Sequence, residues 1–535
     1  MQRTLPASAA QLPALIENRL PAFRPSPVII AAALILAAVL LPLVYLALRA
    51  AGAGAAGLEY LLSARTLAVV GSSLALAGAV VVSSVFIGLP FAWLTARADL
   101  PFRRFWLVAG SLPLVIPSYI GALAYIAAFG PRGLLAQALA PLGVESLPPL
   151  YGFFGAWLAI TLFTYPYIVL PVRAALLNTD PALEEAARSL GLRGWAVFRR
   201  VTLPQLRPAL AAGALLSALY TLSDFGAVAL MRYDAFTRVI YTQYTSSFDR
   251  SRAAILAVML VLVTIGLLVF SRRLASSQRN HRIGAGAARR LRPVALGHWQ
   301  LPALVFCAVL VAVGTFVPVG VLASWVIGRE TGAVDWAPAL VNTVGASGLA
   351  ALTVALAALP LAWLGARSAS RSGRWMSELS YLGNGLPGLV VALALVFFMA
   401  NALPALYQTL PVLILGYAAR FLPLSVGATR SALTQINPRL EEAGRCLGLR
   451  PWQVMARITT PLAKTGILSG GALVFLSAMK ELPTTLLLAP TGFETFATRI
   501  WTAHQEVNFA QIGVPALLLV AVSALSLVLI LKQEA

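Results

Sequence analysis

PALEEAARSLGLRGWAVFRRVTLP, at residues 181–204, returns as PRLEEAGRCLGLRPWQVMARITTP at residues 438–461. The two copies lie 257 residues apart without a gap, and 15 of their 24 positions are identical. A shorter pair repeats in the same order, with PFAWLTAR at residues 90–97 and PLAWLGAR at residues 360–367. The chain is therefore a duplication of one unit, and its fold is best analysed as two related halves.

Each long copy predicts a short helix with defined ends. Asp180 and Asn437 are favourable N-caps ahead of a proline. Gly191 and Gly448 stand where a left-handed residue would end the helix. An apolar stripe runs along the helix, at Leu183, Ala186, Ala187 and Leu190 in one copy and at Leu440, Ala443, Gly444 and Leu447 in the other.

A second amphipathic segment completes each hairpin. It carries Trp195 or Trp452, and we expect Pro204 or Pro461 to stop it. One interpretation is that these helices pack against their own bundle. Two copies with the same spacing fit better with two identical docking sites for a pair of identical partners.

The composition places the rest of the chain in a membrane. Of 535 residues, 59% are hydrophobic and 11% are charged, whereas a soluble domain carries about 25% charged residues. A spanning helix needs roughly 20 apolar residues. Twelve such runs are present, at 27–49, 67–95, 105–129, 149–172, 208–230, 253–271, 301–327, 342–365, 379–401, 406–428, 465–490 and 511–531. We therefore predict an all-α membrane protein of about twelve spans in two six-span repeats.

The basic residues predict the orientation. With both termini assigned to the cytoplasm, Lys and Arg concentrate in the inner segments, and the outer loops hold few apart from four in residues 231–252. Six spans separate equivalent points, so the repeats are parallel. We expect a cytoplasmic segment at 1–26, a first repeat at 27–271, a basic linker at 272–300 and a second repeat at 301–535. Seven arginines in the linker suit anionic lipid headgroups.

Several classes of chemistry have no support in the sequence. No G-x-x-x-x-G-K-[ST] phosphate loop is present, so we do not expect the chain to hydrolyse ATP itself. Two cysteines and three histidines occur without metal-ligand spacing or a nucleophile–base pattern. Net charge of +21 sits in short loops between spans, which argues against nucleic acid as a partner. We therefore predict no enzyme activity, no cofactor and no metal site.

Charged residues inside the predicted spans mark a candidate path. Asp224 lies in the fifth span, and Lys480 and Glu481 lie in the eleventh. Asp224 and Glu481 are separated by the same 257 residues as the hairpins, and each is followed by a helix-disturbing residue. Intramembrane charges cost about 2.5–3.5 kcal/mol each and usually face a cavity or a partner. One interpretation is that these three residues line a translocation path. The alternative is that they form a structural ion pair that involves Lys480.

The outer loop at residues 231–250 is rich in aromatic and oxygen-bearing side chains. Tyr233, Asp234 and Tyr241 are hard ligands of the kind that ferric iron prefers. We nevertheless favour a docking surface for a substrate-binding protein over a direct iron site. Arg499, in the matching loop of the second half, belongs to the same predicted surface.

The hairpins carry a family resemblance. The pattern E-A-A, three residues, G, nine residues and I-x-L-P resembles the signature of membrane permeases of binding-protein-dependent ABC importers. The resemblance assigns contact with the ATPase to Glu185, Ala186, Gly191, Glu442, Ala443 and Gly448. The second copy departs at Gly444 and Thr460. The resemblance implies a type I permease in the bacterial inner membrane, with two copies of a cytoplasmic ATPase and a periplasmic binding protein as partners.

Among fused permeases, the chain most resembles the ferric-iron family. The similarity rests on LPLVIPSYIGALAYIAAFGPRG at residues 112–133, on LSDFGAVAL and RYDAFTRVIYTQY in the first half, and on MKELPTTLLLAP in the second. Thiamine permeases and polyamine permeases are the alternatives within this class. A secondary transporter driven by an ion gradient is the alternative outside it, but such carriers have no use for paired E-A-A hairpins.

Overall fold

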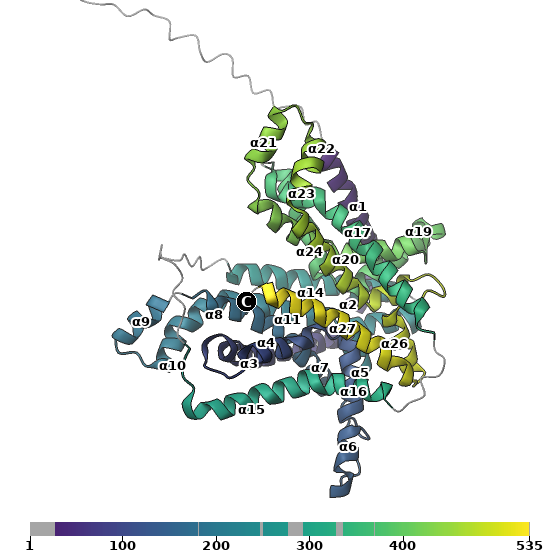
Figure 1. The fold of residues 1–535 in the computed structure, drawn as a ribbon. Coiled ribbons are helices and arrows are strands. Elements are labelled where there is room, and N and C mark those ends of the chain that lie inside the picture. Colours follow the sequence, from purple (N-terminus) through teal and green to yellow (C-terminus); the bar gives the residue numbers. More distant parts are fainter. Residues whose placement is uncertain are drawn as a thin grey trace, which may run out of the picture.

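The computed structural model describes residues 27–179, 181–246, 250–275, 293–327, 335–368 and 370–533. Within these ranges the regular structure is helical, and one isolated parallel bridge joins Ala98 and Val294. Two helical arms meet on one side of the molecule and diverge on the other (Figure 1). The predicted all-α fold is confirmed.

The first half runs from α1 to α14. Its helices are α1 (Pro27–Ala51), α2 (Gly54–Leu62), α3 (Ala64–Arg97), α4 (Arg103–Ser111), α5 (Ser118–Phe129), α6 (Leu134–Leu139), α7 (Phe153–Thr164), α8 (Pro166–Leu177), α9 (Pro181–Ser189), α10 (Gly194–Val197), α11 (Leu203–Ser223), α12 (Gly226–Leu230), α13 (Phe236–Ser246) and α14 (Ser251–Ala275). The helices of the second half are α15 (Gln300–Val311), α16 (Val317–Val326), α17 (Ala337–Arg367), α18 (Arg371–Leu379), α19 (Gly388–Ala402), α20 (Leu410–Gln435), α21 (Arg439–Cys446), α22 (Pro451–Val454), α23 (Thr460–Leu462), α24 (Lys464–Met479), α25 (Pro483–Leu488), α26 (Phe496–Gln505) and α27 (Ala510–Gln533).

The described residues contain nine helices long and apolar enough to cross a membrane, or up to eleven if each of two bent pairs counts as one span. The twelfth predicted run lies in α27, where Ala510–Leu525 forms a shorter apolar helix. Many large apolar side chains on these helices are exposed, as expected for surfaces that face lipid rather than water. The chain is therefore a multi-pass membrane protein.

Some spans are broken at prolines and glycines. Residues 371–383 and α19 meet at 104°, and Pro387 stands immediately before α19. In the first half, Pro117 likewise precedes α5. Proline removes a backbone donor and crowds the preceding turn, so a helix ends or bends there. Such breaks in a membrane need a cavity or protein around them, because lipid cannot satisfy the exposed backbone groups.

The two halves have the same central bundle, and one span of each half also packs against the other half. In the first half α3 packs against α8 and α11, and in the second α17 packs against α20 and α24. The first span of each half also reaches the other half: α1 packs against α19 and α17 as well as against α14 of its own half, and α16 packs against α5 as well as against α27 of its own half. Thr315 Oγ1 also donates a 2.8 Å hydrogen bond to the carbonyl of Ala109 across this junction. The two halves are thus interlocked.

The expectation that Pro204 stops the second hairpin segment is wrong. A continuous helix runs over Gly194–Ser223, with a π-helical turn at Phe198–Thr202. Pro204 falls in the turn that follows, within the first residues of α11, where its missing N–H costs least. In the second half the helix does change direction, because Trp452–Leu462 and Lys464–Met479 meet at 75°.

Candidate functional site

A buried ion pair fixes the first hairpin to its own half. Arg97 Nη2 lies 2.5 Å from Glu184 Oε2, and both side chains are almost completely buried. Thr202 Oγ1 donates a 3.1 Å hydrogen bond to the other carboxylate oxygen of Glu184. Glu184 therefore joins the end of α3, the helix α9 and the π-helical turn at one point. Charge-assisted hydrogen bonds of this kind are short and strongly directional.

The second half repeats this arrangement. Arg367 Nε lies 3.2 Å from Glu441 Oε1, and Thr459 Oγ1 donates to the same carboxylate oxygen at 3.2 Å. The short and long sequence repeats therefore meet in space, because the arginine that ends each short repeat binds the first glutamate of the long one. Both repeats are evident in the sequence, but neither Arg97 nor Arg367 was among the predicted site residues. The sequence does contain a signal for this pairing, because both halves have an arginine at the end of the short repeat and a Glu-Glu pair in the long repeat.

The predicted ATPase-contacting residues lie on the opposite face of each hairpin. Glu185, Ala186, Glu442 and Ala443 are all exposed, as are Gly191 and Gly448. The stripe predicted from the sequence is divided, since only Ala187 and Gly444 face inward. Its leucines point outward, Leu190 being 83% and Leu447 85% exposed. This outward face does not fit a helix that simply packs against its own bundle.

The C-terminal ends of the two hairpin helices follow the sequence. Gly191 and Gly448 adopt φ values of +84° and +85°, the left-handed conformation expected after each helix. The N-terminal end of α21 differs from the prediction: Pro438 is the N-cap rather than the first helical residue, and Asn437 Oδ1, one residue earlier, accepts a 3.1 Å hydrogen bond from the amide of Arg439. Asp180, the predicted cap of the first hairpin, lies outside the described residues. Figure 1 shows α9–α10 and α21–α22 at the far ends of the two diverging arms.

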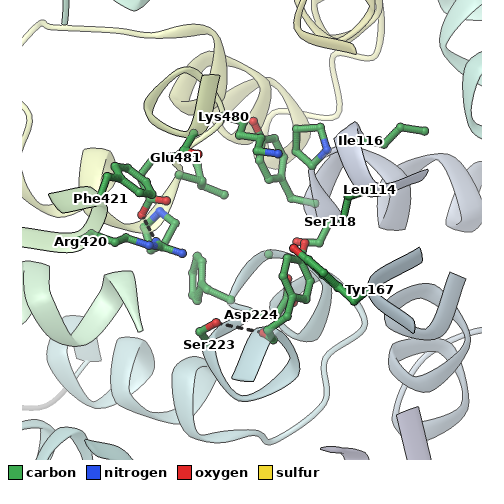
Figure 2. A pocket seen from close by; sticks show the side chains of 18 residues that line it. Leu114, Ile116, Ser118, Tyr167, Ser223, Asp224, Arg420, Phe421, Lys480 and Glu481 are labelled. Carbon is green, nitrogen blue, oxygen red and sulfur yellow. Dashed lines mark hydrogen bonds and ion pairs between the residues drawn. The ribbon is translucent and has the colours of Figure 1, made fainter. Parts of the chain in front are cut away.

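A second candidate site lies where the arms meet. Side chains from both halves enclose a cavity of about 240 Å³. Asp224 of the first half and Lys480 and Glu481 of the second all line it, so the structure brings together the three charges predicted for a path (Figure 2). Asp224 sits between α11 and α12, and the other two between α24 and α25. The helix breaks predicted after these residues are present in both halves.

Both carboxylates cap the helix that follows the break. Asp224 Oδ2 accepts hydrogen bonds from the amides of Ala227 at 2.9 Å and Val228 at 3.3 Å. Glu481 Oε1 accepts from the Thr484 amide at 3.3 Å and from the Thr484 hydroxyl at 2.6 Å. Each carboxylate lies one residue before the N-cap of its helix, Phe225 or Leu482, and satisfies amides left free at the helix start. Asp224 and Glu481 therefore occupy equivalent places in the structure as well as in the sequence.

The ion pair in the cavity is not the one that the sequence suggested. Glu481 pairs with Arg420 Nη1, whereas Lys480 forms no ion pair within the described residues. Arg420 lies in α20 and was not among the predicted site residues. Its signal in the sequence was a lone arginine inside the predicted span 406–428.

Aromatic side chains close the cavity on the side where the arms meet. Phe225, which lines the cavity, lies 5.3 Å from Trp501 of the second half and 4.9 Å from Tyr241, between ring centroids. Packed rings of this kind add roughly 0.5–1.5 kcal/mol per pair beyond their buried area. Tyr241, predicted as a docking residue, therefore contributes to this closure, and burial raises the pKa of its hydroxyl.

The remaining predicted docking residues lie on α13, on α26 or beside them. Tyr233 donates a 2.8 Å hydrogen bond to the carbonyl of Ser72, so its hydroxyl is engaged within the chain. Asp234 is exposed and pairs with Arg238. Arg499 Nη1 lies 3.6 Å from Glu494 Oε2. Of the four residues, Asp234 offers the freest surface to a partner.

The described residues contain no group of three or more His, Cys, Asp or Glu side chains that could hold a metal ion.

Known proteins resemble the chain in both halves. The sequence profile of the family described as "binding-protein-dependent transport system inner membrane component" matches residues 84–280 and again 358–532. The Fe(3+)-transport system permease protein FbpB 2 of Haemophilus influenzae is 32% identical over 502 residues, which cover 92% of this chain and 95% of the relative. The ferric transport system permease protein FbpB of Actinobacillus pleuropneumoniae is 25% identical over 464 residues, covering 82% of this chain and 66% of that protein.

Part of the chain also resembles a sulfate permease. The sulfate transport system permease protein CysT of Escherichia coli is 29% identical over 211 residues, which cover 38% of this chain and 74% of that relative.

Proposed function

The chain belongs to the family of inner-membrane components of binding-protein-dependent transport systems, with one family unit in each half, and we propose that it imports ferric iron. It is the permease of an ABC importer, a multi-pass protein of the inner membrane. The proposal of iron as the substrate rests on the two ferric permeases that resemble the chain over most of its length. Thiamine and polyamines are the competing substrates.

The two hairpins are the proposed docking sites for two copies of a cytoplasmic ATPase. The observation that supports this most directly is the pair of exposed E-A-A faces, each held by a buried Arg–Glu pair on its inner side. Exposed leucines and Trp195 or Trp452 surround the acidic residues. A groove with apolar walls and a basic rim on the ATPase would match this surface. ATP hydrolysis then belongs to the partner, and the hairpins and both termini lie in the cytoplasm.

The opposite side receives the periplasmic binding protein. Helices α13 and α26 occupy equivalent places in the two halves, as their anchoring hydrogen bonds indicate: the amide of Phe236 donates to Ser73 and that of Phe496 to Thr343, each at 2.9 Å. A two-lobed binding protein would place one lobe on each helix. Asp234 is the exposed side chain there that is best placed to contact it.

The arrangement suits an inward-facing resting state. The aromatic closure at Phe225, Tyr241 and Trp501 separates the cavity from the α13–α26 side. On the hairpin side the arms diverge (Figure 1). Closure of an ATPase dimer would draw the two hairpins together and open the aromatic contact. The free energy comes from the difference in ATPase affinity for the two states.

Uptake of ⁵⁵Fe by iron-starved cells that lack this gene tests the function. The wild-type chain should restore uptake, and Glu185→Lys/Glu442→Lys should not. A matched control reverses Glu59 and Glu145, two exposed carboxylates outside the hairpins. The double hairpin variant should also lose co-purification of the ATPase, which the control should retain. Uptake restored equally by both variants would contradict the docking role. Failure of the wild-type chain to restore uptake would contradict iron, and labelled thiamine would be tried next.

A further inference from the structure

The cavity between the halves has an unusual balance of charge. Two carboxylates, one guanidinium and one ammonium line it, so its formal charge is zero. Three of these four groups already have partners. Asp224 is held by the amides at the start of α12, and Glu481 is held by Arg420 and Thr484. The charge that has neither a hydrogen bond nor an ion pair within the described residues is that of Lys480.

Lys480 is held in the cavity wall. No hydrogen bond or ion pair involves its ammonium group within the described residues, although it follows the end of α24 in a largely protein-enclosed position. Figure 2 shows Lys480 and Arg420 entering the cavity from the second half, opposite Asp224 and Ser118 of the first. An ammonium group in such a position with neither a hydrogen bond nor an ion pair is costly, and an anion in the cavity would offset that cost.

An independent observation comes from Tyr119. This side chain also lines the cavity, is 3% exposed and has no hydrogen-bond partner for its hydroxyl within the described residues. Buried polar groups are normally hydrogen-bonded, so an orphaned hydroxyl at a cavity wall points to a missing ligand. A phenol is a good donor to an anionic oxygen. Lys480 and Tyr119 together provide one charged and one neutral donor, from opposite halves.

A bare ferric ion does not fit these donors. Trivalent iron seeks several hard anionic oxygens, whereas Lys480 supplies none and both cavity carboxylates are already engaged. The free ammonium would repel it. The sign of the unpartnered charge therefore selects for oxyanions.

We propose that Lys480 and Tyr119 form a recognition site for a small oxyanion, and that iron crosses this cavity as an anion-coordinated ferric complex. The anion's outer oxygens would accept from the ammonium and the phenol, and its other oxygens would remain on the metal. This deepens the proposed iron transport and rests on it. A free oxyanion carries the same chemistry, so the test has to separate the two sources.

The experiment uses proteoliposomes that contain the permease with its ATPase, with the loaded binding protein outside. ⁵⁵Fe is supplied with ³³P-phosphate, ¹⁴C-citrate or ¹⁴C-carbonate, and both labels are counted inside. A parallel arm supplies ³⁵S-sulfate and ³³P-phosphate without iron. We expect iron to enter together with one labelled anion in a fixed ratio, and the iron-free arm to show no uptake.

Variants assign the effect to the site. Lys480→Gln should lower iron uptake at least tenfold, Lys480→Arg should restore most of it, and Tyr119→Phe should raise the KM severalfold with little change in kcat. Lys464→Gln, at the exposed start of the same helix, is the matched control and should behave as wild type. The amount of co-purified ATPase checks that each variant is folded.

The outcomes separate the two proposals. Iron that enters without any of the three labels, or unchanged uptake in Lys480→Gln, would overturn the anion site and leave iron transport standing. Uptake of a free oxyanion without iron, lost in Lys480→Gln, would keep the anion site and overturn iron as the substrate. Equal loss in Lys480→Gln and Lys480→Arg would show that Lys480 acts only in packing, which also contradicts the proposal.

Discussion

The two halves of the molecule agree closely at the hairpins and differ at the cavity. Each hairpin has a buried arginine, glutamate and threonine on one face and an exposed E-A-A face on the other. In the cavity, Arg420 and Lys480 of the second half stand 257 residues after Phe163 and Ser223 of the first. The hairpins, which we propose to dock two identical partners, have remained equivalent, whereas the cavity, which we propose to meet one asymmetric substrate, has diverged.

The largest expected effect is a loss of stability when the buried Arg–Glu pair of one hairpin is broken. Glu184→Gln or Glu441→Gln leaves an arginine buried without its counter-charge, which costs about 3–5 kcal/mol. Both variants should lower the thermal unfolding temperature of the purified complex and expose the hairpin to proteolysis. The Arg97–Glu184 pair is buried on both sides, whereas Arg367 is slightly more exposed, so the first variant should be the more severe. A Glu184→Gln protein as stable as wild type would contradict the stabilising role of the Arg97–Glu184 ion pair.

The next effect tests the divergence at the cavity. Arg420→Phe gives the second half the residue found in the first and leaves Glu481 without its cation. We expect iron uptake to fall at least tenfold, because an unpaired buried carboxylate either takes up a proton or reorganises the cavity. Phe163→Leu is the matched change in the first half and should retain most uptake. Equal losses in the two variants would mean that the halves contribute alike to the cavity.

A smaller effect tests whether the glycine turns of the two hairpins are equivalent. Gly191→Ala and Gly448→Ala place a side chain at φ values of +84° and +85°, which costs about 1–2 kcal/mol. No atom lies within 4 Å of either added methyl group, so backbone strain alone accounts for the effect. Each variant should weaken ATPase co-purification by a similar factor. A clear difference between them would show that the two docking sites are not equivalent.

The smallest effect concerns pH at the outer side. His504 on α26 stands 260 residues after Tyr244 on α13. Burial, and then the nearby charge of Arg232, lower the pKa of His504, so the folded protein favours the neutral imidazole. Stability from this site is therefore present above the ordinary histidine pKa of about 6.5 and is lost as the pH falls through the lowered folded-state pKa.

The unfolding temperature measured between pH 7.5 and 5.5 checks this behaviour. Wild type should lose stability on acidification, and His504→Tyr, which copies the first half, should flatten that part of the profile. An unchanged profile in the variant would assign the acid sensitivity to other groups.

Much of the fold follows from patterns in the sequence. The apolar runs predicted helices that the structure contains, because the length and composition of a run decide whether it can satisfy its backbone in lipid. The glycines predicted left-handed helix ends for the same local reason. The role of Pro204 could not be predicted, since a π-helical turn ahead of it removes the conflict that a regular helix would have had.

The sequence by itself determined the duplication, the membrane class, the two hairpins and the pseudo-symmetry of Asp224 and Glu481, because each depends on spacing along the chain. Only the tertiary structure decided which partner each charge has. Adjacent residues of a helix point about 100° apart, so spacing alone does not tell that Glu184 faces in and Glu185 faces out. Glu481 likewise pairs with Arg420, 61 residues away, rather than with its neighbour Lys480. Ion pairs depend on distance in space, and packing between helices sets that distance.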